Sequence, residues 1–262
     1  MNARHATRYL AWRFAAPKVP EVTAQFWFLK LLTTGMGEAT SDYFVHRCNP
    51  IAAVLVSGVI FLGALIAQLA SSRYATYPYW FAVVMVSVFG TMCADVVHVG
   101  FGVPYAVSSA VFAVALVAVF VTWQRVEHTL SIHSITSSRR ELFYWSTVTV
   151  TFALGTAVGD GSAATLGLGY LKSGLFFLAL FSAVGIKFAI RRRQPIASFW
   201  CAYVLTRPLG ASFADWLGRP PALGGRNWGP GTVALLSSAV IAITVVLVAR
   251  HERKENSRPS LG

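Results

Sequence analysis

Five of the ten acidic residues of this chain stand inside strongly apolar segments, where a carboxylate is costly to keep. They are Glu38, Asp42, Asp95, Asp160 and Asp215. Carboxylates in such positions commonly bind a cation or relay a proton. Their oxygen atoms are hard ligands, which suit Mg²⁺ or Mn²⁺ better than copper. These residue types therefore predict a pathway for a small cation, either a proton or a divalent metal ion.

Each aspartate of this set ends a repeated pattern that starts with a tryptophan fifteen residues earlier. A glycine follows the tryptophan by ten residues, and a small residue comes directly before the aspartate. The tryptophans are Trp27, Trp80, Trp145 and Trp200, and the glycines are Gly37, Gly90, Gly155 and Gly210. Self-similarity of this kind indicates a chain built from one duplicated unit. The glycine and the small residue predict close helix packing and no chemistry.

Composition places this pattern in a membrane. Of the 262 residues, 55% are hydrophobic and only 12% are charged, whereas soluble domains carry about a quarter charged residues. Apolar runs recur that approach or reach the roughly 20 residues needed to span a bilayer. We therefore expect an all-α integral membrane protein with eight transmembrane helices. The predicted spans are residues 22–45, 51–71, 79–100, 104–124, 141–160, 169–190, 196–217 and 231–249.

The basic residues separate by side of the membrane. With these spans, 16 of the 22 lysines and arginines fall on one side and 4 on the other, while Lys30 and Arg207 lie within spans. By the positive-inside rule, the richer side and both termini are cytoplasmic. The net charge of +12 is thus a topology signal and does not indicate nucleic-acid binding. We expect a cytoplasmic tail over residues 1–21, a single membrane domain over 22–249 and a basic cytoplasmic tail over 250–262.

Each repeat is expected to form a hairpin of a patterned helix and a plainer apolar helix. The four hairpins cover about residues 22–71, 79–124, 141–190 and 196–249. Two spans per repeat make the patterned helices cross in one direction, so the repeats are parallel and pseudo-symmetric about the membrane normal. A rise of about 22 Å from tryptophan to aspartate puts the tryptophans near the cytoplasmic interface. The aspartates then share one depth toward the opposite side.

A polar stripe runs along the patterned helices toward the aspartates, because positions 3, 7, 11 and 15 after the tryptophan share one helix face. Such a stripe must face protein or water. We expect hydroxyl oxygens of this stripe to join the ion pathway, namely those of Thr34, Thr91 and Thr156.

Lys30 and Arg207 break the repeat, since the other repeats have no cation at these positions. A buried cation needs a carboxylate nearby. The simpler interpretation is neutralisation, of Lys30 by Glu38 or Asp215 and of Arg207 by one of the aspartates. The sharper interpretation makes one of the two cations a gate or counter-ion that a transported cation displaces.

His98 follows Asp95 by three residues, so both side chains lie on one helix face. An aspartate and a histidine at this spacing can ligate a transition metal. A single histidine near a helix end is also typical of a hydrogen-bonded structural residue. Both interpretations of this pair remain open.

Two other functional classes compete with transport. The repeated aspartates could brace helix ends in a non-transporting scaffold or partner subunit, because duplication copies structural residues as faithfully as functional ones. An intramembrane enzyme is the third class, but the chain contains no nucleophile elbow, HExxH or phosphate loop in context. We therefore expect no enzyme activity and no cofactor. The expected partners are the lipid bilayer and a small cation, and the sequence leaves open whether the protein forms an oligomer.

The first repeat resembles an uncharacterised family of bacterial membrane proteins, defined by tandem two-helix repeats of unknown function that share a tryptophan. The resemblance rests on Lys18-Val-Pro-Glu-Val-Thr23, Phe26-Trp27, Lys30, Thr33-Thr34, Gly37-Glu38 and Asp42, and it extends over roughly residues 18–248. Glycine-rich turns at Leu166–Gly169 and Leu223–Gly225 also look like those of the family. The first repeat has Asn49-Pro50 in place of that turn. The resemblance implies four repeats in a bacterial inner-membrane protein of eight spans, and it implies no established activity.

Overall fold

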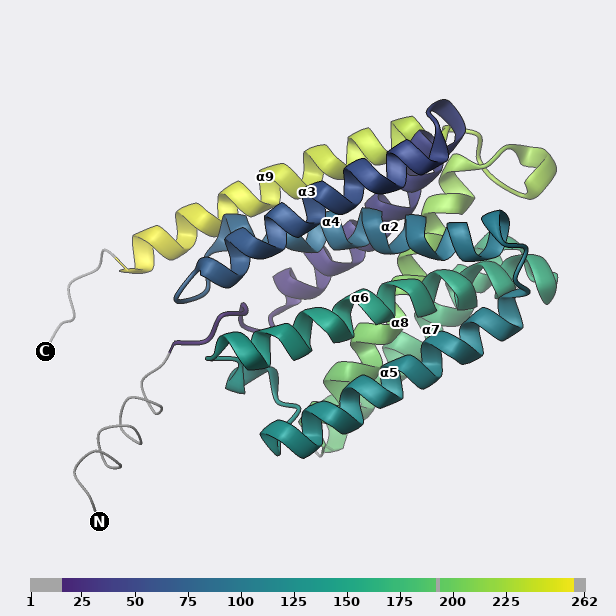
Figure 1. The fold of residues 1–262 in the computed structure, drawn as a ribbon. Coiled ribbons are helices and arrows are strands. Elements are labelled where there is room, and N and C mark those ends of the chain that lie inside the picture. Colours follow the sequence, from purple (N-terminus) through teal and green to yellow (C-terminus); the bar gives the residue numbers. More distant parts are fainter. Residues whose placement is uncertain (1–15, 192–193, 257–262) are drawn as a thin grey trace, which may run out of the picture.

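Eight long helices and no strand make up the part of the chain that the computed structural model describes, residues 16–191 and 194–256 (Figure 1). The long helices are α2 (Ala24–Arg47), α3 (Pro50–Ala70), α4 (Thr76–Asp95), α5 (Tyr105–Glu127), α6 (Ser138–Asp160), α7 (Gly169–Arg191), α8 (Pro195–Gly218) and α9 (Pro230–Asn256). Shorter turns are η1 (Val96–Gly100), η2 (Ile132–Ser134), η3 (Gly161–Thr165) and η4 (Pro221–Leu223). The predicted all-α class is confirmed. Each long helix starts within three residues of the predicted span.

Local sequence signals set these helix starts. Thr23 Oγ1 accepts a hydrogen bond of 3.2 Å from the backbone N–H of Phe26 and so caps α2. Asn49 caps α3 in the same way, and Pro50 takes the first helical position, where its missing N–H costs nothing. The Asn49-Pro50 pair therefore serves the first repeat as a helix start.

The structure describes parts of the two predicted tails. Residues 1–15 and 257–262, together with Arg192 and Arg193, lie outside the described residues. Helix α9 continues to Asn256, because Glu252 accepts a hydrogen bond from Thr76 Oγ1 and attaches this extension to the start of α4. Lys18 and Val19, which belong to the cytoplasmic tail predicted over residues 1–21, are buried in the bundle.

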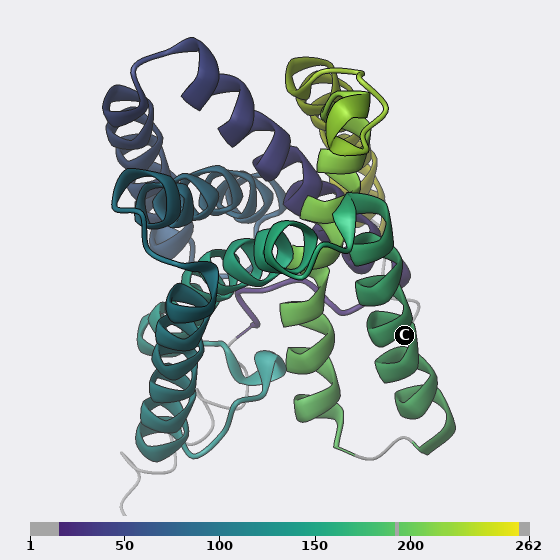
Figure 2. The same ribbon diagram turned by 90° about the vertical axis from the view of Figure 1, so that its right-hand side faces the viewer.

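The four patterned helices form a closed inner ring. Helix α2 packs against α4 and α8, and α6 packs against the same two helices. Below, the end of the ring that carries the tryptophans is the tryptophan end, and the opposite end is the aspartate end. Both described ends of the chain lie at the tryptophan end (Figure 1). Figure 2 looks onto the aspartate end and shows the inner helices converging in the middle of the bundle.

The outer helices join neighbouring repeats. Helix α3 packs on α4, α5 on α6, α7 on α8, and α9 returns to α2. Each outer helix thus packs mainly on the inner helix of the next repeat, and the two helices of one repeat make few contacts with each other. The predicted hairpins are therefore open, and the last repeat closes the circle on the first.

Hydropathy separates the two layers. Six described helices are long and apolar enough to cross a membrane, and among them the outer four are only 17–22% buried, against 56% and 61% for α4 and α6. Helices α2 and α8 have 24 residues each but fall outside this group, because they carry the charged residues of the ring interior. The outer layer leaves its apolar surface for lipid, while the inner ring shields the polar side chains.

Glycines set the spacing of the inner ring. The glycine of each repeat lies against the side chain at the seventh position after the tryptophan in the next repeat. A Cβ atom added at Gly37, Gly90, Gly155 or Gly210 would come within 2.7, 2.8, 2.5 or 2.9 Å of the Cβ atom of Ser87, Phe152, Arg207 or Thr34, respectively. Any larger residue would force the helices apart, so the small-residue packing predicted from the pattern is present at all four crossings.

Three of the four repeated tryptophans are buried inside the protein, and Trp27 is partly buried. Trp80, Trp145 and Trp200 are at most 5% exposed, so the protein itself surrounds their rings. Trp200 Nε1 donates a hydrogen bond of 2.9 Å to the carbonyl of Leu130. Neighbouring aromatic rings pack edge-on against them, as in the 5.3 Å contact of Tyr144 with Trp145. The tryptophans thus build a packed aromatic layer that closes the tryptophan end of the ring.

We expect a glycine at a helix crossing to tolerate substitution less well than a glycine on an outer helix. We expect Gly90→Ala to lower the free energy of unfolding by about 1–3 kcal/mol, because the added methyl group meets the rigid Cβ of Phe152. Gly63→Ala on α3 is the matched control, since no atom lies within 4 Å of its added Cβ. Thermal unfolding in detergent measures both variants. Equal shifts in the two variants would contradict the proposed role of the crossing.

Candidate functional site

The aspartate end of the ring brings the predicted carboxylates together. Helix α2 supplies Glu38 and Asp42, while Asp95 and Asp160 are the last residues of α4 and α6, and Asp215 lies in the last turn of α8. The π-helical turns η1 and η3 follow Asp95 and Asp160 directly. Such turns often mark functional sites, because they interrupt the regular hydrogen bonding of a helix.

Three of these carboxylates form a compact cluster. One oxygen each of Glu38, Asp160 and Asp215 lies within 4.8 Å of the others, and the three residues come from α2, α6 and α8. This spacing allows one cation to contact all three side chains. Oxygen ligands of this kind suit a hard divalent ion, for which carboxylates are the usual protein ligands.

Arg207 occupies the ring axis beside this carboxylate cluster. Its Nη2 atom lies 2.7 Å from Glu38 Oε2, and both side chains are at most 3% exposed. The same nitrogen donates to Thr156 Oγ1 at 2.7 Å and also to Thr91 Oγ1. One guanidinium group therefore joins α8 to α2, α4 and α6. The partner oxygens from these three helices all stand at the eleventh position after a tryptophan.

Arg219 is a second fixed cation at the mouth of the site. It lies just beyond α8, with Nη2 at 2.7 Å from Asp42 and Nε at 3.1 Å from Asp215. Burial lowers the pKa of Arg219, but the carboxylates of Asp215 and Asp42 raise it by more, so the net shift is upward. Arg219 therefore stays charged and bridges the first and fourth repeats.

Asp95 and Asp160 take part in no ion pair within the described residues. Asp95 accepts a hydrogen bond of 2.9 Å from Ser41 Oγ on α2. The aspartate end thus holds five carboxylates, three of which make ion pairs with the guanidinium groups of Arg207 and Arg219. The aspartate end carries an excess of acidic groups that protons or a bound cation must balance.

Lys30 lies deeper, on the tryptophan side of Arg207. Its side chain is buried, and its Nζ atom lies 4.2 Å from the ring centre of Phe152 and 4.3 Å from that of Tyr203. No ion pair of the described residues includes Lys30. The simpler sequence interpretation, neutralisation by Glu38 or Asp215, is therefore wrong in this structure, where aromatic faces hold the ammonium group. Arg207 does pair with a carboxylate, but with Glu38 rather than with an aspartate.

The predicted threonines divide into two kinds. Thr91 and Thr156 present their oxygens to Arg207, as described above. Thr34 instead donates to the carbonyl of Leu31 at 2.6 Å and also contacts the carbonyl of Thr206. It therefore serves the contact between α2 and α8.

The predicted metal pair of Asp95 and His98 has separate partners. His98 Nδ1 lies 3.1 Å from Ser108 Oγ, and its ring packs on Tyr105 at 4.5 Å between ring centres. Asp95 accepts from Ser41 across the ring. The three-residue group with metal-ligand spacing contains Asp160 and Asp215 instead.

The sequence patterns did not predict that Ser41 and Arg219 belong to the site. Ser41 was assigned to helix packing alone, although it also donates to Asp95. Arg219 was counted only as a basic residue outside the spans. Its position four residues after Asp215 is a usable signal, since residues at this spacing are neighbours on a helix surface.

The Arg207–Glu38 pair should be strongly coupled. We expect Glu38→Gln to destabilise the protein by about 3–5 kcal/mol, because it leaves a buried guanidinium group without its carboxylate. The double variant Glu38→Gln with Arg207→Met should be less destabilised than the sum of the single variants. Arg139→Gln is the control, since its 69% exposed side chain makes an ion pair with Glu127 that is worth about 1 kcal/mol or less. Additive effects in a double-mutant cycle would contradict the coupling.

Comparison with protein families supports the repeated architecture. A family model described as "Repeat of Unknown Function (DUF347)" matches residues 78–129, 143–194 and 198–254, each starting two residues before a repeated tryptophan. The first predicted repeat, around Trp27, is not among the matched residues, although α2 and α3 take the fourth place in the ring. No significant match was found among curated proteins or among solved structures. The three matches cover more than half of the chain, which therefore belongs to the DUF347 repeat family.

Proposed function

We propose that this protein is a transporter or channel for a small cation, a proton or a divalent metal ion such as Mn²⁺ or Mg²⁺. The observation that carries the proposal is the cluster of Glu38, Asp160 and Asp215, whose oxygens lie within 4.8 Å of one another inside a membrane bundle. Arg207 and Arg219 balance the charges of Glu38 and Asp215, which leaves Asp160 as the carboxylate of the cluster that a proton or a bound cation would balance. The cluster is therefore expected to alternate between protonated and cation-bound states.

Arg207 would compete with a bound cation for the carboxylate of Glu38. Glu38 belongs to the cluster and is also the carboxylate partner of Arg207. A cation that binds Glu38 must weaken its bond with the guanidinium group. Since that group also holds Thr91 and Thr156, binding would be transmitted to α4 and α6. Arg207 is thus proposed as a counter-ion that the transported cation displaces.

We propose a bacterial cytoplasmic membrane as the location, with the tryptophan end and both termini in the cytoplasm. The distribution of basic residues supports this orientation, since 16 of 22 are assigned to that side. The carboxylate cluster would then lie toward the extracytoplasmic side. A cation would reach it past Arg219.

A membrane scaffold is the second candidate function. The observation in its favour is that Asp42, Asp95 and Asp215 each have a protein partner that braces the ring. Asp160 distinguishes the two functions, because within the described residues its side chain makes no ion pair or hydrogen bond that could brace the ring, while it belongs to the cluster.

Asp160→Asn tests transport directly. We expect cation flux in proteoliposomes, followed with pH and Mn²⁺ reporters, to fall by about tenfold or more. Stability should change by less than about 1 kcal/mol, because no brace is lost. Asp42→Asn is the matched control, in which the contact with Arg219 weakens and stability falls. Wild-type protein that passes none of the tested ions would turn the conclusion to the scaffold.

Arg207→Gln tests the competition. With the internal cation gone, we expect the apparent affinity for the transported divalent ion to rise by about tenfold. The added ion should also recover part of the stability lost in the variant, because it binds the folded state. Arg207→Lys keeps a charge near Glu38 and should change affinity less. Binding titrations with Mn²⁺ measure these effects, and a lower affinity in Arg207→Gln would contradict the proposed competition.

A further inference from the structure

An extended segment crosses the tryptophan end of the ring. It consists of residues Pro17–Thr23 and is called the strap below. Figures 1 and 2 show it passing beneath the inner helices, close to the bundle axis. Pro17 and Pro20 keep it from continuing α2 as a helix. Without helical hydrogen bonds of its own, the strap depends on bonds to its surroundings.

Lys18 fastens the strap on several sides. Its Nζ atom makes an ion pair with Glu141 of α6 and donates to the carbonyl of Leu69 at 3.0 Å. Its backbone N–H donates to the carbonyl of Ile135 at 2.8 Å. The ammonium group thus reaches α3 and α6, which belong to different repeats. Lys18 and Glu141 are at most 4% exposed, so water does not replace these contacts.

Gln68 adds hydrogen bonds to the ion pair of Lys18 and Glu141. Its Nε2 atom donates to Glu141 Oε1 at 2.8 Å and to the carbonyl of Lys18 at 3.2 Å. The backbone N–H of Tyr74 donates to the carbonyl of Pro17 at 2.9 Å. A buried ion pair adds little net stability, but it selects one geometry strongly, because breaking it leaves uncompensated charge. Lys18, Gln68 and Glu141 therefore form a specific latch.

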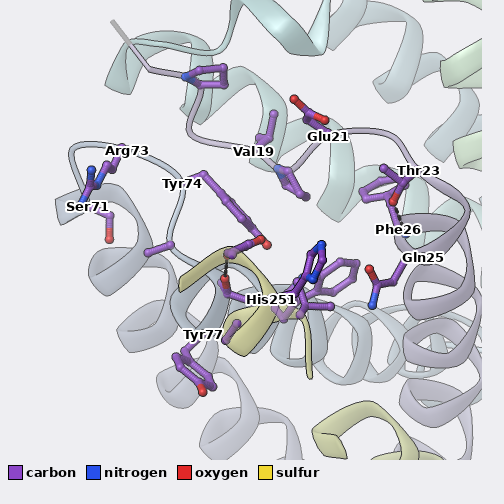
Figure 3. A pocket seen from close by; sticks show the side chains of 18 of the residues that line it. Val19, Glu21, Thr23, Gln25, Phe26, Ser71, Arg73, Tyr74, Tyr77 and His251 are labelled. Carbon is purple, nitrogen blue, oxygen red and sulfur yellow. Dashed lines mark hydrogen bonds between the residues drawn. The ribbon is translucent and has the colours of Figure 1, made fainter. Parts of the chain in front are cut away.

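A pocket lies on one side of the strap. It has a volume of about 950 Å³ and is lined by the strap, the loop between α3 and α4, the starts of α2 and α4, and the end of α9 (Figure 3). Tyr74 and His251 stand at its wall, and Leu29 and Trp80 line it from the inner helices. Val19 of the strap lines the pocket and also belongs to the core cluster that contains Tyr79 and Tyr144. The strap thus forms one wall of the pocket, and core residues of the inner helices such as Leu29 and Trp80 form another.

We propose that the strap is the gate at the tryptophan end, that the pocket is the vestibule outside it, and that the latch of Lys18, Gln68 and Glu141 holds it closed. The proposal rests on the proposed function, since a gate needs a pathway to close. The ligand of the vestibule is the same small cation. Release of Lys18 from Glu141 would free the strap from α6 and connect the vestibule with the axis below Lys30.

Thiol labelling tests the gate without any transport assay. In a background with Cys48, Cys93 and Cys201 replaced by serine, Val148→Cys places a reporter on α6 at a position that is 0% exposed. Val148 stands at the same repeat position as Lys30 and Tyr203, which meet inside the ring. Ser72→Cys, in the exposed loop between α3 and α4, reports general accessibility. A small membrane-impermeant methanethiosulfonate is added from the tryptophan end in membrane vesicles.

The latch variant is Lys18→Gln. We expect the labelling rate of Val148→Cys to rise by about tenfold or more, since local opening no longer breaks the latch. Lys18→Arg should keep the rate near that of the wild type, and Arg139→Gln, which removes a 69% exposed arginine from its ion pair with Glu127, should leave it unchanged. If Lys18→Gln fails to fold, Lys18→Gln with Glu141→Gln decides, because this pair leaves no uncompensated charge.

The outcomes separate the two proposals. Unchanged labelling of Val148→Cys in a folded latch variant, with Ser72→Cys still reactive, would overturn the gate even where cation flux is present. Faster labelling without flux of any tested cation would support the gate and overturn the cation as cargo. Faster labelling together with faster flux is the expected result.

Discussion

The four inner helices can form a closed ring only because a glycine stands at each of their crossings. At each crossing, an added Cβ atom would come within 3.0 Å of the neighbouring side chain. The close approach brings side chains from all repeats to one axis, where Arg207 alone reaches three other helices. Wider spacing would separate the carboxylates, so the candidate cation site depends on packing as much as on its acidic residues.

Acidic, basic and aromatic side chains follow one another in that order along the axis. The aspartate end carries five carboxylates, Arg207 stands next to them, Lys30 lies among aromatic faces, and the aromatic layer and strap follow. Both buried cations occupy positions where other repeats have uncharged residues. Duplication thus supplied a symmetric frame, and departures from symmetry supplied the charges within it. Fixed cations thus stand on both sides of the carboxylate cluster, Arg219 at its mouth and Arg207 beneath it.

The repeats also differ in how their aspartates are held, and in this respect they fall into two pairs. The first and fourth are joined by Arg219, which holds Asp42 and Asp215 together. The second and third end in π-helical turns, and their aspartates have no ion pair in the described part of the chain. An arginine therefore joins the aspartates of one half of the ring, whereas in the other half Asp95 is held by the hydroxyl group of Ser41. The outer helices connect these halves, since each packs on the next repeat.

Sequence alone determined the all-α class and the starts of the eight long helices, because hydropathy and helical periodicity act over short stretches of chain. The glycine positions also predicted close packing correctly. Only the tertiary structure decided which side chains contact one another. Arg207 pairs with Glu38 across 169 positions of sequence, Lys30 meets Phe152 and Tyr203, and Lys18 enters the bundle to reach Glu141. These choices depend on which helix faces which across the ring, and no local pattern encodes the angle at which two repeats cross.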